Sequence, residues 1–232
     1  GGRNDLEDRV VRCVGEPDRR FEEDALRILR ALRFAAVLDF SIDPATAVSL
    51  RQHREQLHLV AAERISAELQ KLLCGAGAGR VLREFPEVFS VFLPELEPLW
   101  GFDQHTPYHL WDIYEHTIRS VEAVRPDPVL RLTMLLHDIG KPDCYFTDEK
   151  GQGHFKGHPA VSAAMSGKIL RRLRMDGDTV RRVRTLIQWH DAGIRPEDTH
   201  IRRWLRVLGR EDFFALLEVK EADNAAQNQE LS

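Results

Sequence analysis

The stretch VLRLTMLLHDIGKPDCYF, residues 129–146, decides how the C-terminal half of this chain folds. Its apolar run predicts a buried helix that ends close to Gly140, with His137 and Asp138 in its last turn. Imidazole nitrogens and carboxylate oxygens are both good ligands for divalent metals at hydrolytic centres. The pair therefore predicts a metal site at the end of this helix if further ligands reach it.

Most of the remaining sequence has the 3.6-residue apolar period of helices. RRFEEDALRILRALRFAAVL, residues 19–38, predicts a single helix. Asp43 and Pro44 predict the N-cap and first residue of the next helix, and Gly75 predicts the end of the one after it. Later helices are expected over residues 108–124, 158–173, 176–190, 197–208 and 210–227.

One segment interrupts the helical pattern. In CYFTDEKGQGHFKGH, residues 144–158, β-forming residues flank a Lys-Gly turn, which predicts a short hairpin. We therefore expect a mainly α chain with a small β-hairpin insertion and a boundary between two parts near residues 101–106.

Composition narrows the class of protein. The chain has 232 residues and a net charge of -4, so its overall charge does not indicate a nucleic-acid partner. Three widely spaced cysteines predict reduced thiols in a cytoplasmic protein, and no apolar run approaches the ~20 residues of a membrane span. Because it begins GGRNDL without methionine, we expect the chain to be a fragment.

Further candidate ligands lie on or beside the other predicted helices of the C-terminal half. The helix before residues 129–140 is joined to it by a short turn, so the two are expected to pack antiparallel and bring ligands together. A single histidine near a helix end is more often a cap or a surface residue, and that alternative stays open for each one. The candidates are His116, His137, Asp138, His158, His190 and Asp223.

The order of a histidine, the motif HDIGK and a distant helical aspartate resembles the HD superfamily of metal-dependent phosphohydrolases. The resemblance implies catalysis by His137, Asp138 and Lys141, with a metal that lowers the pKa of bound water toward ~7. Lys141 would neutralise a phosphate oxygen; the alternative is a cation that favours a helix C-terminus. The implied metal is Mg²⁺, Mn²⁺, Ni²⁺, Fe or Zn²⁺, held by His116, His137, Asp138 and Asp223, with a second ion or the phosphate at His158 and His190.

The helix predicted over residues 19–38 carries a second candidate site. Asp24 and Arg27 are three residues apart, so their side chains are expected on one helix face. The plain explanation is an exposed ion pair that contributes about 0.3–0.5 kcal/mol. A carboxylate and a guanidinium held together also present acceptors and donors as the reading of a base edge requires.

Three stretches, GGRNDL, RCVGEPDRRFEEDALRILRALRFAA and ERISAELQKLL, closely resemble bacterial tRNA nucleotidyltransferases, the CCA-adding enzymes, and the related poly(A) polymerases. EDALRILR matches the EDxxR motif of base recognition, which implies that Asp24 and Arg27 pair with the base of CTP or ATP. The resemblance implies Mg²⁺ and the tRNA 3′ end as cofactor and partner, small phosphoesters at the HD site, nucleotide binding by Glu23, Asp24, Arg27 and Arg30, and bracing by Glu63 and Arg64.

By this resemblance, residues 1–20 are a remnant of the polymerising head, 21–75 the neck, 76–105 a connector and 106–232 the HD domain. The Gly-Ser loop and paired aspartates of the head are missing from the sequence, so we expect this chain alone not to add nucleotides. Two alternatives stay open: a poly(A) polymerase relative, and an RNA-binding module whose HD fold is only structural.

Overall fold

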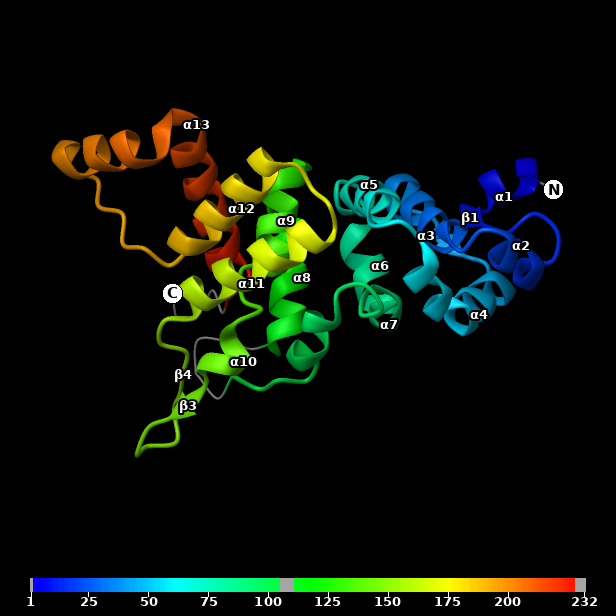
Figure 1. Ribbon diagram of the computed structural model, residues 1–232, viewed down its shortest axis with the longest axis horizontal. Helices are drawn as coiled ribbons and strands as arrows, with labels where there is room; N and C mark the ends of the chain where they lie inside the picture. Colours follow the sequence, from blue (N-terminus) through cyan, green and yellow to red (C-terminus); the bar gives the residue numbers. More distant parts are fainter. Residues whose placement is uncertain (1, 105–110, 228–232) are drawn as a thin grey trace. The chain divides into compact units, whose positions relative to one another are not determined.

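A computed structural model describes residues 2–104 and 111–227 of the chain (Figure 1). The described part is mainly helical with two small two-stranded sheets, which confirms the predicted fold class. The chain divides into two compact units. The N-terminal unit holds residues 1–97 with 126–128 and 172–175, and the C-terminal unit holds 98–125, 129–171 and 176–232.

The N-terminal unit is built around α3. Helices α5 and α6 both pack against it, and the parallel strands β1 and β2 pair Val10 with Ser41 and Val11 with Ile42. The elements of this unit are α1 (Gly2–Glu7), β1 (Val10–Val11), α2 (Pro17–Glu23), α3 (Leu26–Leu38), β2 (Ser41–Ile42), α4 (Pro44–Gln52), η1 (Arg54–Leu59), α5 (Ala62–Leu73), α6 (Ala78–Glu84), α7 (Pro86–Phe89) and, reaching past the boundary, η2 (Pro94–Leu99).

The single helix predicted over residues 19–38 is wrong, because the chain breaks between α2 and α3. Asp24 has an extended backbone, with φ -155° and ψ 100°. Its side chain accepts a hydrogen bond from the amide of Leu26 at 3.1 Å, and such local side-chain bonds compete with the helical backbone pattern. Glu23 therefore ends one helix, whereas Arg27 and Arg30 lie on the next.

Two predicted helix ends are confirmed. The Asp43 side chain caps α4 by accepting the amide of Thr46 at 3.1 Å, and Pro44 is the first helical residue. Gly75 follows α5 directly after its cap residue Cys74. A side chain at position 75 would collide with the backbone of Ala36 on α3, so a glycine is needed where these two helices meet.

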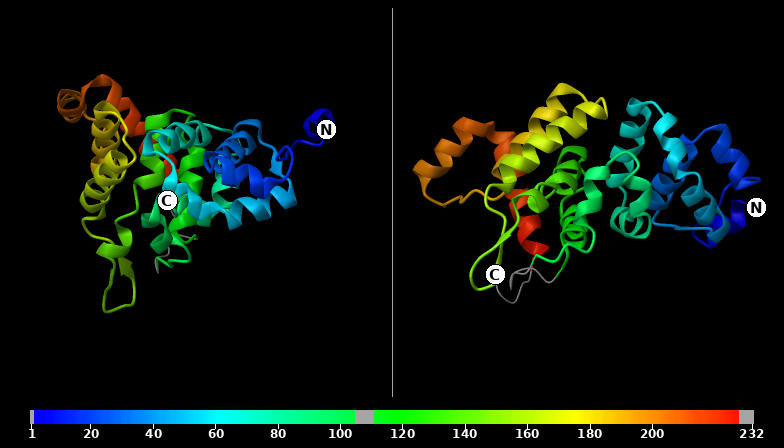
Figure 2. Two further views of the ribbon diagram at one scale, coloured as in Figure 1. Left: turned by 45° about the vertical axis from the view of Figure 1, so that its right-hand side comes forward. Right: turned by 60° about the horizontal axis from the view of Figure 1, so that its bottom comes forward.

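The C-terminal unit is held together by helices around the buried α9. Figure 2 shows the C-terminal part of α13 beside α8, and α12 also packs against α13. Almost every residue of α9 from Leu130 to Leu136 is buried. The elements are α8 (Ile113–Ala123), α9 (Pro128–Leu136), α10 (Lys141–Cys144), β3 (Phe146–Thr147), β4 (Gly153–His154), α11 (His158–Arg172), α12 (Gly177–Trp189) and α13 (Asp198–Ala225).

Three details of this unit bear on the sequence predictions. The antiparallel hairpin of β3 and β4 is confirmed. Helix α8 begins only after its cap Asp112, later than predicted, and residues 108–110 of that prediction lie outside the described residues. Gly209, with φ 75° and ψ 170°, interrupts α13 at the point where two separate helices are predicted.

The approach of Gly75 to α3 generates a stability prediction. In Gly75→Ala the added Cβ would lie 2.5 Å from the carbonyl carbon of Ala36, and backbone atoms cannot rotate aside. We expect the free energy of unfolding in urea to fall by about 1–3 kcal/mol.

The matched control is Gly177→Ala in the first turn of α12, where a Cβ meets nothing within 4 Å. This variant is expected to be neutral or slightly stabilising, because alanine favours helix over glycine. Equal unfolding midpoints for the two variants would contradict the account of this helix contact.

Candidate metal centre

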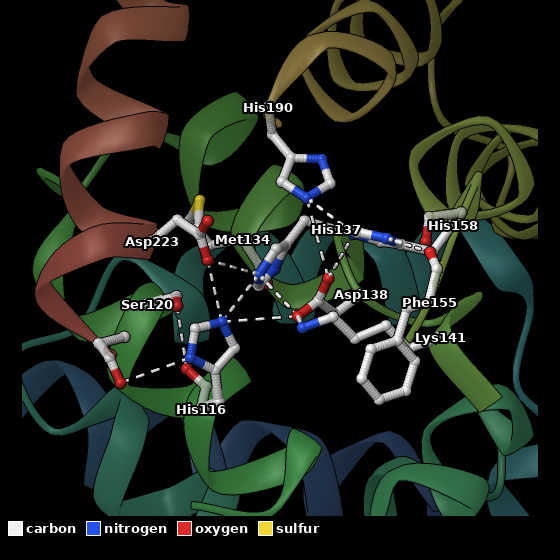
Figure 3. Close-up of polar contacts among 12 residues, drawn as sticks. His116, Ser120, Met134, His137, Asp138, Lys141, Phe155, His158, His190 and Asp223 are labelled. Carbon is white, nitrogen blue, oxygen red and sulfur yellow. Dashed lines mark hydrogen bonds and ion pairs between the residues drawn. The ribbon is translucent and has the colours of Figure 1, made fainter. Parts of the chain in front are cut away.

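Four side chains from three helical segments meet in the core of the C-terminal unit (Figure 3). His116 lies on α8, His137 and Asp138 directly follow the end of α9, and Asp223 lies in the last turns of α13. His116 Nε2 is 2.9 Å from Asp223 Oδ1, 3.3 Å from His137 Nε2 and 3.5 Å from Asp138 Oδ2. The structure thus brings together the four residues that the sequence nominates, which we name the first group.

Two more histidines approach the other oxygen of the same aspartate. His158 is the first residue of α11 and His190 follows α12. Their Nε2 atoms are 3.2 Å apart, and they lie 3.2 Å and 3.8 Å from Asp138 Oδ1. We name Asp138, His158 and His190 the second group. Asp138 belongs to both groups, and each of its carboxylate oxygens faces a different pair of histidine nitrogens.

Backbone carbonyls fix how these histidines present their nitrogens. In His137, His158 and His190 the Nδ1 atom lies 2.7–2.9 Å from the carbonyl oxygen three residues earlier. His116 Nδ1 lies 3.4 Å from the carbonyl of Ala226. Because a carbonyl only accepts, each Nδ1 carries the donated proton, and in the neutral ring Nε2 keeps its lone pair. All four Nε2 atoms lie within 3.8 Å of an oxygen of Asp138.

This arrangement fits a bound cation. Two imidazole lone pairs 3.2–3.3 Å apart repel each other unless a proton or a metal ion lies between them. Both oxygens of Asp138 are buried, and neither has a well-aligned hydrogen bond within the described residues, although Lys141 Nζ lies 2.7 Å from Oδ2. Nitrogen and carboxylate donors of this kind fit a divalent transition metal or Mg²⁺.

The charges of the site act on its titrating groups. Burial opposes protonation of His137, but the carboxylates of Asp138 and Asp223 outweigh it and raise its pKa to about 10. Burial likewise opposes ionisation of Asp138, yet the charges of His137 and Lys141 hold its pKa well below its usual value. Burial lowers the pKa of His190 to about 4, with the positive charge of His137 acting in the same direction. Without a metal ion, the charges of His137 and Lys141 thus balance the carboxylates of Asp138 and Asp223, and a bound cation would take the place of the His137 proton.

Lys141 lies beyond the end of α9, in the four-residue helix α10. It is the first residue of α10 and is 5% exposed. Its Nζ contacts Asp138 and donates to Gln104 Oε1 at 3.0 Å. Sequence reasoning missed Gln104, because nothing in its local pattern shows that it is buried against a lysine 37 residues away.

A cavity of about 640 Å³ opens onto both groups. Asp138, Lys141, His158, His190 and Asp223 line its inner side. The hairpin and the segment after it also line the cavity, through Phe146 and residues 152–157. A molecule in this cavity would contact metal ligands and hairpin side chains at the same time.

The second candidate site lies in the N-terminal unit, and its predicted pairing is wrong. Asp24 Oδ2 accepts from Arg64 at 3.0 Å, and Arg27 instead bonds Glu23 at 2.6 Å. Burial opposes ionisation of Asp24, but the bonds from Arg64 and from the Leu26 amide outweigh it and lower the pKa of Asp24. The side chains of Asp24 and Arg27 are still held in place, Asp24 by Arg64 and Arg27 by Glu23.

The two remaining residues of this prediction are open to solvent. Arg30 is exposed and lines, with Arg27 and Cys13, a cavity of about 250 Å³. Glu63, which is predicted to brace the helix together with Arg64, is also exposed.

The fold and the buried donor set define a helical protein with side chains that could hold a divalent cation. A family model described as "Probable RNA and SrmB- binding site of polymerase A" matches residues 39–99. The A-adding tRNA nucleotidyltransferase of Deinococcus radiodurans and the CC-adding tRNA nucleotidyltransferase of Thermus thermophilus are each 35% identical over 97% of this chain and 54% of their own length. The chain is homologous to these enzymes over nearly its whole length and spans about half of theirs.

A solved structure shares the fold. The Bacillus stearothermophilus CCA-adding enzyme in complex with CTP has a TM-score of 0.57 and 23% identity over 97% of this chain and 53% of that one. None of the helices in residues 2–104 and 111–227 combines the length and hydropathy that a membrane span requires.

The shared carboxylate generates a prediction about metal content. We expect purified protein to lose the ion of the first group in His116→Ala, to lose a second ion in His190→Ala if the second group holds an ion and not a phosphate, and to lose all bound metal in Asp138→Ala, because only Asp138 belongs to both groups. Metal analysis by inductively coupled plasma mass spectrometry measures this directly.

The control is His200→Ala, a histidine of the same unit that lies outside both groups. It should keep the full metal content. Stoichiometric metal in Asp138→Ala would contradict the assignment.

Proposed function

We propose that this chain is part of a tRNA nucleotidyltransferase that adds nucleotides to the tRNA 3′ end, and that its C-terminal unit is a metal-dependent phosphohydrolase. Homology over nearly the whole chain supports the first statement. Because the chain spans about half of those relatives, nucleotide addition, CTP, ATP, Mg²⁺ and tRNA are proposed for the whole protein. A poly(A) polymerase relative is the second candidate, because the description of the matching family model names polymerase A.

One observation carries the phosphohydrolase proposal: four buried Nε2 atoms and two carboxylates converge beside an accessible cavity. A bound divalent cation supplies polarisation of a phosphoryl oxygen and lowers the pKa of water. His116, His137, Asp138 and Asp223 would hold it, and His158 and His190 would hold a second ion or contact the phosphate.

Lys141 provides a further positive charge at the inner side of the cavity. A buried ammonium beside a phosphate offsets its negative charge as a point charge. Its contacts to Asp138 and Gln104 hold it at the inner side of the cavity, so we assign it to the orientation of a phosphate oxygen.

A 2′,3′-cyclic nucleotide is a suitable substrate for such a site. The oxygen of water bonds to phosphorus, one of the two bonds between phosphorus and a ribose oxygen breaks, and a proton moves to the departing ribose oxygen. The product is a 2′- or 3′-phosphate.

We expect slow hydrolysis of 2′,3′-cyclic AMP by metal-loaded protein, measured by chromatography of the products. The activity should disappear on chelation and in His137→Ala, which removes a ligand of the first group, and it should persist in the control His200→Ala. Metal-loaded protein without turnover on cyclic, 2′- or 3′-phosphates would favour the alternative in which the HD fold is only structural.

The fixed acid and base of the N-terminal unit support base selection. Asp24 is held by Arg64 and Arg27 by Glu23, so a carboxylate and a guanidinium keep set directions. A good bidentate contact discriminates between bases by about 1–3 kcal/mol, whereas charge attraction to a triphosphate does not distinguish them.

In the whole nucleotidyltransferase, Asp24→Ala or Arg27→Ala should reduce the preference for CTP and ATP over UTP and GTP by about tenfold, which is ~1.4 kcal/mol. Incorporation into tRNA measures the preference. The fold should survive, because partly exposed ion pairs contribute little stability. Unchanged selectivity together with lowered thermal stability would assign these residues to ordinary helix pairing.

A further inference from the structure

The β3–β4 hairpin forms one side of the cavity that faces the candidate metal centre. It projects from the helices of the C-terminal unit between α10 and α11 (Figure 1). Phe146, Gln152, His154 and Lys156 from this segment line the cavity together with residues of the two groups. None of these four side chains belongs to the set that would hold a cation.

Two rings on this hairpin form a stacked pair. Phe146 and His154 are directly opposite each other across the strands, so their side chains lie on the same face. Their ring centres are 5.3 Å apart with an angle of 27° between the planes. Phe146 is 49% exposed, so about half of its ring surface gains no stabilisation from burial. A flat, accessible aromatic surface therefore faces the cavity.

The turn of the hairpin holds this surface in place. One carboxylate oxygen of Asp148 accepts from the amides of Lys150 and Gln152 at 2.9 Å and 3.0 Å. The other oxygen lies 2.9 Å from His154 Nε2. The imidazole is thus fixed from the turn side, and its ring plane supports that of Phe146.

Positively charged side chains also line this cavity. Lys156 is exposed, lines the cavity and has no carboxylate partner in residues 2–104 and 111–227. Lys141, on the inner side of the same cavity, has its ammonium 5.3 Å from the ring centre of Phe155. A ligand with an aromatic end and an anionic end matches these groups.

We propose that the hairpin recognises the base of a nucleoside phosphate: the base stacks on Phe146, supported by His154, and Lys156 pairs with the phosphate. Stacking on an aromatic side chain accepts any base, because every base has a π face. The proposal rests on the phosphohydrolase function and adds to it the residues that hold the base of a nucleoside phosphate, free or at an RNA end.

The test compares 2′,3′-cyclic AMP with methyl riboside 2,3-cyclic phosphate, which has the same reacting group but no base. For the wild-type protein we expect kcat/KM to favour the nucleotide by about tenfold. Phe146→Ala should reduce that ratio at least about fivefold, and Phe146→Tyr should restore it. Phe214→Ala, an exposed phenylalanine of the same unit outside the cavity, is the control and should keep the wild-type ratio. A wild-type ratio near one, or an unchanged ratio in Phe146→Ala, would overturn the proposal.

Lys156 is tested separately from the rings. Lys156→Gln should raise KM for both substrates several-fold without changing their ratio, and Lys156→Arg should restore KM. Lys168→Gln, on α11, is the control with the same loss of charge and should behave as wild type. An unchanged KM in Lys156→Gln would remove this residue from the proposal.

A binding measurement separates failure of this inference from failure of the phosphohydrolase function. Isothermal titration of 3′-AMP and of methyl riboside 3-phosphate needs no turnover. We expect tighter binding of 3′-AMP, lost in Phe146→Ala and kept in Phe214→Ala. If neither cyclic phosphate is hydrolysed but this difference is present, the catalytic proposal fails and base recognition stands. Equal binding of the two phosphates would reject base recognition whatever the turnover.

A short RNA ending in a 2′,3′-cyclic phosphate identifies the source of the nucleoside phosphate. A higher kcat/KM for this RNA than for 2′,3′-cyclic AMP indicates an RNA end, and a lower kcat/KM indicates the free nucleotide.

Discussion

The structure of the C-terminal unit depends on the carboxylate of Asp138, which lies between two pairs of histidine nitrogens. A buried carboxylate is costly unless opposite charge and hydrogen bonds compensate it. Here it is 1% exposed, and nitrogens of His116 and His137 face one oxygen while those of His158 and His190 face the other. The helices that carry these residues therefore have to pack around one common point.

Helix ends explain how the histidines come to face that point. The last carbonyls of a helix lack intrahelical partners, so a side chain just beyond the end can donate to them. His137 follows α9 and His190 follows α12, and each ring donates from Nδ1 to the carbonyl three residues earlier. The same bond that satisfies the helix end fixes the tautomer and leaves Nε2 free for a cation.

Much of this was predictable because the signals are local. HDIGK after an apolar run, the Asp43 cap and the Lys-Gly turn each act within a few residues, and each is found in the structure. The break between α2 and α3 was not predictable, because the apolar period continues through Asp24. The Asp24 side chain accepts a hydrogen bond from the backbone of Leu26, which competes with the helical pattern. Contacts between residues distant in sequence also could not be predicted: Arg64 is 40 residues from Asp24, and Gln104 is 37 residues from Lys141.

The most direct test of this account is anomalous X-ray diffraction from crystals grown with Mn²⁺. The account predicts an anomalous peak bonded to Asp138 Oδ2, to Asp223 and to the Nε2 atoms of His116 and His137, with every Nδ1 still directed at a backbone carbonyl. A map without a peak at Asp138, or with a ligand bond from Nδ1, would contradict the claim that these histidines are oriented to hold a metal ion.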